Sequence, residues 1–339
     1  MGNVQPKNRR FASWMILPAL AAGLAILPLG LNPYALVILT LAYIYAAAAA
    51  SWDLLAGYAG QLSFGQVAFF GIGGYAVGLL AYHFPYWYWL SNPISATIVG
   101  ILASVAFSVF IGASSVRMRG PYFAAVTFIS VIVLQQIVII FGDCGAQNVA
   151  LPTHFDWNHK YCTGGQFGLM MPSLKLFGDN RLTYWASLVY MIVSLASMML
   201  IVRSRYGLYF KCIRDDEIAA QAIGINPTKY KLVAFAISAV FCSVAGSWYV
   251  FTSGLVNTDM FGYGYNFLWI EMVVIGGMTT IIGTIPGALF VGIVSELLRA
   301  NPAIALAVFA GIFVLVVRFL PEGVIPLLKR KIGRRLGLR

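Results

Sequence analysis

The sequence has little charge and none of the local motifs that carry catalysis. Asp, Glu, Lys and Arg make up 10% of its 339 residues, and three residues are His. It contains no Gly-Lys pair, so it has no phosphate-binding P-loop, and it contains no HExxH, GxSxG or paired-cysteine motif. A hydrolase or a metalloenzyme would lack its reacting groups. We therefore predict a non-catalytic chain that binds no metal and no cofactor.

Long apolar runs take the place of charge. Hydrophobic residues account for 60% of the chain, and the mean hydropathy is +0.83, which excludes a soluble domain of this length. Uncharged runs of about 17–25 residues predict membrane-spanning helices. The sequence therefore predicts an all-α polytopic membrane protein, a single transmembrane domain over residues 1–339 with about ten spans, the short ones belonging to broken helices. The predicted spans are Phe11–Leu31, Ala35–Ala50, Val67–Tyr82, Ile94–Val116, Tyr122–Gly142, Tyr184–Val202, Leu232–Ser253, Phe267–Ile285, Ala288–Leu298 and Ala303–Val317.

Basic residues lie mainly on alternate loops. If the chain starts in the cytoplasm and crosses ten times, 18 of its 22 Lys and Arg residues lie on the cytoplasmic side and four on the outer side. Because positive charge keeps loops in the cytoplasm, we predict both termini on the cytoplasmic face of a bacterial inner membrane. The net charge of +11 and the C-terminal KRKIGRR cluster then indicate contact with membrane lipid and not with nucleic acid.

The first span has a second interpretation. Lys7, Arg9 and Arg10, followed by the apolar run to Leu31, also resemble a signal peptide. We favour a retained span, because removing it would reverse the side of every later loop.

The long loop 143–183 is predicted to lie outside. It contains Cys144 and Cys162, which form a disulfide or remain two unpaired thiols, and the sequence leaves both open. His154 and His159 share the loop, but their spacing from the cysteines is not a known zinc-ligand pattern.

Glycines and amides cluster in Leu54–Gly78, a stretch too broken for an ordinary span. Unwound backbone at membrane depth is stable only where it is buried in protein or lines a cavity, so this cluster is a candidate substrate path. Close helix packing through small residues is the alternative. The candidate path residues here are Gly57, Gly60, Gln61, Ser63, Gly65, Gln66, Gly73 and Gly74.

A second glycine cluster lies in the other half of the chain. Gly276 and Gly277, with Gly283, Pro286 and Gly287, interrupt the predicted eighth and ninth spans, and Gly276 and Gly277 are further candidate path residues. If spans one to five and six to ten are repeats, their odd number makes the repeats inverted, and each half then contains one break.

Two acidic residues lie in or beside the spans. Glu271 is either a structural hydrogen-bonding partner or a substrate ligand, because a carboxylate in a membrane normally faces the protein interior or a cavity. We expect Asp53 at the inner interface of the membrane, where its cost is small.

The segment 203–231 is the longest charged stretch between two apolar runs. Asp215, Asp216 and Glu217 suit a helix N-terminus, and Gly224 suits its left-handed end. Asn226 and Pro227 then start the next helix. A short helix with a small face, Ala219 and Ala220, is suited to docking another protein, whereas an ordinary basic loop would only fix orientation. The predicted docking segment contains Arg214, Asp215, Asp216, Glu217, Ala219, Ala220 and Gly224.

Six motifs in order resemble those of the LivM-type permeases, the membrane subunits of branched-chain amino acid ABC importers. They are LLAGYAGQLSFGQVAFFGIGGYAVGLL (54–80), MRGPYFAAVTF (118–128), TGGQFGLMMP (163–172), IRDDEIAAQAIGIN (213–226), EMVVIGGMTTIIGTIPGA (271–288) and FLPEGV (319–324). The resemblance runs from about residue 34 to 326. Gln66 stands where the family commonly has His, the loop before residue 163 is long, and Ile218 fills the position of a common loop glutamate.

The resemblance implies a permease that pairs with a second permease subunit. Two cytoplasmic ATPase subunits would dock on 203–231, and an extracytoplasmic substrate-binding protein would deliver branched-chain or other hydrophobic amino acids. Related permeases carry urea or short amides and, more distantly, sugars or nucleosides. A stand-alone channel or a membrane scaffold is the alternative of another class, but neither needs a docking helix.

Overall fold

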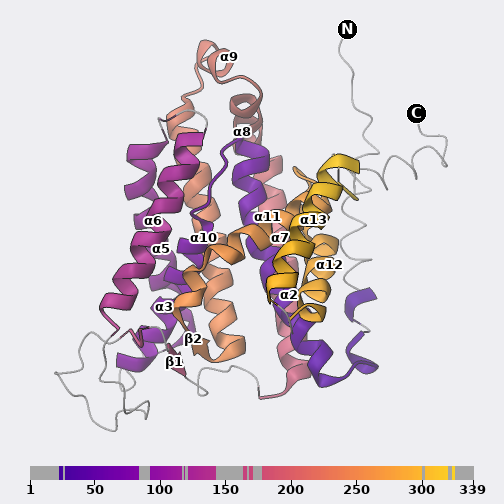
Figure 1. Ribbon diagram of the computed structural model, residues 1–339. Helices are drawn as coiled ribbons and strands as arrows, with labels where there is room; N and C mark the ends of the chain where they lie inside the picture. The colour runs from indigo at the N-terminus through magenta and orange to yellow at the C-terminus, as the bar shows by residue number, and fades with distance from the viewer. Residues whose placement is uncertain are drawn as a thin grey trace.

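The computed structural model is a bundle of helices (Figure 1). Within the described residues the sheet consists of two short strands, β1 Leu169–Met170 and β2 Leu255–Val256, paired antiparallel. The predicted all-α class is therefore confirmed. The structure describes residues 23–25, 27–83, 92–116, 118, 121–142, 163–165, 168–170, 178–299, 302–319 and 323–324.

Several helices can cross a membrane. In the described part of the chain five are long and apolar enough, and α11 with α12 makes a sixth span if this bent pair counts as one. The predicted first span lies largely outside the described residues. The helices are α2 (Pro33–Asp53), α3 (Gln66–His83), α5 (Pro93–Ser115), α6 (Pro121–Ile140), α7 (Asn180–Arg203), α8 (Arg205–Asp215), α9 (Glu217–Ala222), α10 (Pro227–Ser253), α11 (Tyr263–Gly276), α12 (Thr284–Leu297) and α13 (Pro302–Phe319).

Asparagine followed by proline starts three of the long helices. Asn32, Asn92 and Asn226 take extended backbone angles immediately before the prolines that open α2, α5 and α10. The Asn92 carboxamide accepts from the Ile94 amide at 3.2 Å, and the Asn226 carboxamide accepts from the Lys229 amide at 3.1 Å. Each proline has the backbone angle that a first turn needs and no amide to leave unpaired.

The helix α10 runs from the end of the bundle that carries α8 and α9 to the end that carries β1 and β2 (Figure 1). It packs closely against α3 because small residues face each other. A side chain at Gly73 would collide with the carbonyl oxygen of Ser243, and the Ser247 hydroxyl donates to the carbonyl oxygen of Gly73 at 3.1 Å. A side chain at Gly246 would in turn collide with the backbone of Phe70. The core of the bundle therefore depends on backbone contact between these two helices.

One predicted boundary is wrong, and one predicted break is confirmed. The second span ends later than Ala50, because α2 continues to Asp53 and then through a π-helical turn, Leu54–Tyr58. The break that the second glycine cluster predicts within Phe267–Ile285 is present, since α11 ends at Gly276 and the pair α11–α12 is bent by 111°.

Candidate functional site

The chain between α2 and α3 is unwound over residues 60–65 (Figure 1). Gly60 has φ +71°, a left-handed angle that ends the π-helical turn. Side chains of other helices then pair with the freed backbone. The Trp52 indole donates to the carbonyl oxygen of Ser63 at 2.7 Å, and the Thr127 hydroxyl accepts from the Phe64 amide at 3.2 Å. Asn266 donates to the carbonyl oxygen of Phe64. The unwound segment is thus held in protein, as backbone within a membrane must be.

The second break joins α11 to α12. Gly277 has φ +109°, and Thr279 has φ 63°, a left-handed angle that is uncommon for a side chain branched at Cβ. Gly276 lies so close to the carbonyl oxygen of Gly283 that no side chain would fit between them. The glycines of the second cluster therefore allow the backbone angles and the close backbone contacts of the break.

The two breaks meet at Thr279. The Asp53 carboxylate oxygen Oδ1 accepts from the Thr279 amide at 2.9 Å, and the Tyr58 hydroxyl donates to the Thr279 carbonyl oxygen at 2.5 Å. Gly57 leaves room for this contact, because a side chain there would collide with Asp53. Asp53 is buried, so its carboxylate depends on donors from the protein, and its expected position at the inner interface of the membrane stays a prediction.

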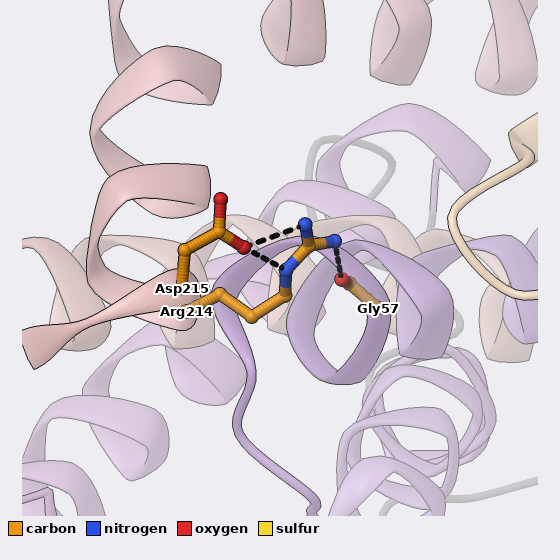
Figure 2. A network of polar contacts seen from close by, with 3 residues as sticks. All are labelled: Gly57, Arg214 and Asp215. Carbon is orange, nitrogen blue, oxygen red and sulfur yellow. Dashed lines mark hydrogen bonds and ion pairs between the residues drawn. The ribbon is translucent and has the colours of Figure 1, made fainter.

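Helix α8 lies against the same place. The Arg214 guanidinium donates from Nη1 to the carbonyl oxygen of Gly57 at 2.9 Å (Figure 2). It also binds Asp215 Oδ1, through Nε at 3.0 Å and Nη2 at 2.8 Å. The Lys211 ammonium lies 5.5 Å from the centre of the Tyr58 ring. A side chain at Gly60 would come within 2.8 Å of Arg214 Cγ, so Gly60 allows α8 to approach.

The predicted short helix in 203–231 is confirmed as α9. Asp216 is its N-cap and accepts from the Ile218 and Ala219 amides at 2.8 and 3.0 Å, and Gly224 has φ +85°. Lys231 of α10 binds Glu217 at 2.8 Å, which fastens α9 to the bundle. Asp215, by contrast, is the last residue of α8.

The outward side of α9 carries more apolar surface than the sequence predicts. Ile218 is 68% exposed and Ile223 is 70% exposed. Of the two alanines predicted for docking, Ala219 is exposed and Ala220 is buried. The apolar surface available to a partner therefore includes Ile218, Ala219, Ala222 and Ile223.

The remaining predicted path residues separate into two groups. Gln61, Ser63, Gly65 and Gln66 are buried in or beside the unwound segment; Gln61 Oε1 and both amide atoms of Gln66 have no partner among the described residues. Gly73 and Gly74 lie instead within the continuous helix α3, where packing accounts for them. Cys144 and Cys162 lie outside the described residues.

The sequence did not indicate that Asp53, Tyr58 and Thr279 form one contact. The sequence offered one indication of this contact: Asp53 lies directly before a glycine cluster, and a carboxylate that is buried needs a hydrogen-bond donor. Its partner, 226 residues away in the sequence, could not be identified from local pattern.

We expect Asp53→Ala to destabilise the protein more than Asp53→Asn. Alanine leaves the buried Thr279 amide without an acceptor, which costs about 1–3 kcal/mol, whereas the asparagine oxygen still accepts. Thermal denaturation of the purified proteins measures the difference. Equal losses for the two variants would show that the contact with Thr279 is not the source of the stability.

Comparison with known proteins places this arrangement in a family. Residues 34–317 match the model of the family described as "Branched-chain amino acid transport system / permease component". The high-affinity branched-chain amino acid transport system permease proteins LivM of Salmonella typhimurium and Escherichia coli are each 27% identical over 88% of this chain, and over 73% and 72% of their own length. The ribose import permease protein RbsC of Escherichia coli is 24% identical over 61% of this chain and 65% of its own. No solved structure matches.

The family match begins within α2 and ends within α13, so it includes both breaks and the α8–α9 segment between them. The resemblance seen in the six motifs is thereby confirmed over most of the chain. This multi-pass membrane protein belongs to the branched-chain amino acid transport system permease component family.

Proposed function

We propose that this chain is the membrane permease subunit of an ATP-driven importer of branched-chain or other hydrophobic amino acids. The family match over residues 34–317 carries the proposal. The two relatives of highest coverage are named for the transport of branched-chain amino acids, and the ribose permease covers less of the chain. ATP hydrolysis takes place, in this proposal, in separate partner subunits and not in this chain.

The proposed complex contains a second permease subunit, two cytoplasmic ATPase subunits and an extracytoplasmic substrate-binding protein. The α8–α9 end of the bundle carries Arg205, Lys211, Arg214 and Lys229, which supports placing it in the cytoplasm of a bacterial inner membrane. Both termini then lie on that side as well. The apolar residues of α9 would bind the ATPase. Isoleucine side chains that are exposed to water outside the membrane gain stability when another protein covers them.

Transport would proceed by alternating access. ATP binding and hydrolysis in the partner subunits move the docked α9. Helix α8 directly precedes α9 in the chain, and Arg214 connects α8 to the π-helical turn at Gly57. Tyr58 and Asp53 connect that turn to the second break at Thr279. A displacement of α9 can therefore reach both broken helices through contacts that already exist.

The cargo is tested by uptake into cells that express the complete transporter. We expect uptake of radiolabelled leucine, isoleucine or valine that depends on the cognate binding protein and on ATP. Ribose and urea, measured in parallel, are the controls for the more distant relatives. Uptake of ribose or urea without uptake of any branched-chain amino acid would contradict the proposed cargo.

Docking is tested on the exposed residues of α9. We expect Ile218→Asp with Ile223→Asp to abolish co-purification of the ATPase, because each buried isoleucine contributes about 1.5–3 kcal/mol. That energy corresponds to roughly a 10- to 100-fold change in affinity for each residue. Gln221→Asp is the control for each single substitution, since it adds one negative charge to an exposed polar position of the same helix and removes no isoleucine. Normal co-purification of the double variant would exclude α9 as the docking element.

Transmission is tested at Arg214. We expect Arg214→Ala to lower uptake about tenfold or more while the ATPase still binds and hydrolyses ATP, because a hydrogen bond from a charged donor contributes about 1.5–3 kcal/mol. Asp215→Asn is the control, because it leaves the Arg214 contact with Gly57 available. If both variants transport normally, force does not pass through this contact.

A further inference from the structure

The chain returns to the second break shortly after α13. This helix ends at Phe319, and Gly323 then lies against Gly277. A Cβ atom added to Gly323 would lie 2.2 Å from the Cα atom of Gly277 and 2.5 Å from its amide nitrogen, too close for any side chain. Gly323 also has φ +78°, a left-handed angle that glycine adopts without strain. The last of the six motifs, FLPEGV, therefore places backbone directly on backbone at the break.

Val324 anchors this segment to the bundle. Its side chain is half-buried and packs against the hydrophobic core, and Gly323 is itself buried. No hydrogen bond joins Gly323 or Val324 to residues 276–283 among the residues that the structure describes. The contact therefore depends on shape and on van der Waals attraction, which declines steeply once a gap of about 0.5–1 Å opens. We call Gly323 and Val324 the α13 clasp.

The second break makes contacts of two kinds. Asp53 and Tyr58 hold Thr279 through hydrogen bonds, which have a preferred length and direction and so carry a displacement of the π-helical turn to the break. The α13 clasp, by contrast, only touches Gly277. Met278 is 40% exposed and Thr279 is exposed, so the described residues leave part of the break uncovered. The break therefore has room to move, and the clasp opposes that movement by contact alone.

We propose that Gly323 is a positioning residue: the α13 clasp sets the resting position of the second break, and Gly277 separates from the clasp when ATP drives the α8–α9 segment. This proposal rests on the proposed function, from which it takes the ATP-driven partner. A contact between two glycines suits this role, because it fits closely in one position and leaves no buried hydrogen-bonding group unpaired when it opens. A permanent support would instead keep the clasp and the break together throughout the cycle.

Cross-linking across the contact tests the separation. In a parent whose four cysteines are replaced by serine, Met278→Cys and Val324→Cys place one thiol beside each of the two touching glycines. A bifunctional methanethiosulfonate reagent joins the thiols, and a reductant releases them. In the complex reconstituted with its second permease and ATPase subunits, we expect the cross-link to form without nucleotide and to be lost after ATP trapping. An equal yield in the two states would overturn the proposal.

The same cross-link shows whether transport needs the separation. We expect the cross-linked transporter to lose ATP-driven uptake, and the reductant to restore it. The controls are the two single-cysteine variants treated with the reagent, which should transport as the parent does. Uptake that continues in the cross-linked protein would show that the break works without leaving the clasp.

Gly323→Ala changes the resting position without a cross-link. The added methyl group collides with the backbone of Gly277, so we expect uptake to fall while ATP hydrolysis and subunit assembly continue. Gly311→Ala is the matched control, because the same methyl group on α13 meets nothing within 4 Å. Normal uptake by Gly323→Ala, or loss of uptake together with loss of ATPase co-purification, would overturn the positioning role.

These readouts separate the clasp from the cargo. If leucine is not taken up while ATP trapping still removes the cross-link, the proposed substrate is wrong and the clasp stands. If the parent takes up leucine while the cross-link is unchanged by ATP, the clasp is wrong and the proposed function stands.

Discussion

The hydrogen bond from the Thr279 amide to the Asp53 carboxylate joins the end of α2 to the break between α11 and α12. Backbone that leaves a helix inside a membrane needs partners from the protein itself. Here one side chain at the end of α2 supplies the acceptor for a residue at the second break, and Tyr58 supplies a donor to the same residue. Gly57 permits this approach by having no side chain. This contact joins the π-helical turn to the bent α11–α12 pair, and α8 reaches the same turn through Arg214.

The function proposed for this chain requires force to pass from a subunit outside the membrane to helices within it. In this chain the elements that could do so touch one another in sequence: α9 is fastened to α10 by Glu217 and Lys231, and α8 reaches the π-helical turn through Arg214. Such a series of packed and hydrogen-bonded elements is a physical route for coupling. The close backbone contact between α3 and α10 holds these two helices together next to the coupled elements.

The sequence predicted the helical class, most spans and the short helix α9 because each is set by local pattern. Apolar runs define the spans, Asp216 and Gly224 define the ends of the short helix, and Asn226 defines the start of α10. The sequence could not assign a role to each glycine. Gly60 and Gly277 allow the backbone angles of the breaks, whereas Gly73 and Gly74 allow close helix packing, and both pairs lie in similar glycine-rich stretches. The meeting of Asp53 with Thr279, and the exposure of Ile218 and the burial of Ala220, depend on tertiary structure, which local pattern does not encode.

The proposed coupling requires α9 and the α11–α12 break to move together. Spin labels on α9 (Gln221→Cys) and in the break (Met278→Cys) report this directly, with Phe110→Cys on α5 as the reference, all in a parent whose four cysteines are replaced by serine. Pulsed electron resonance then measures distances in the assembled transporter before and after ATP trapping. We expect the distance between positions 221 and 278 to stay the same while the distance between 221 and 110 changes. A change between 221 and 278 as large as that between 221 and 110 would contradict it.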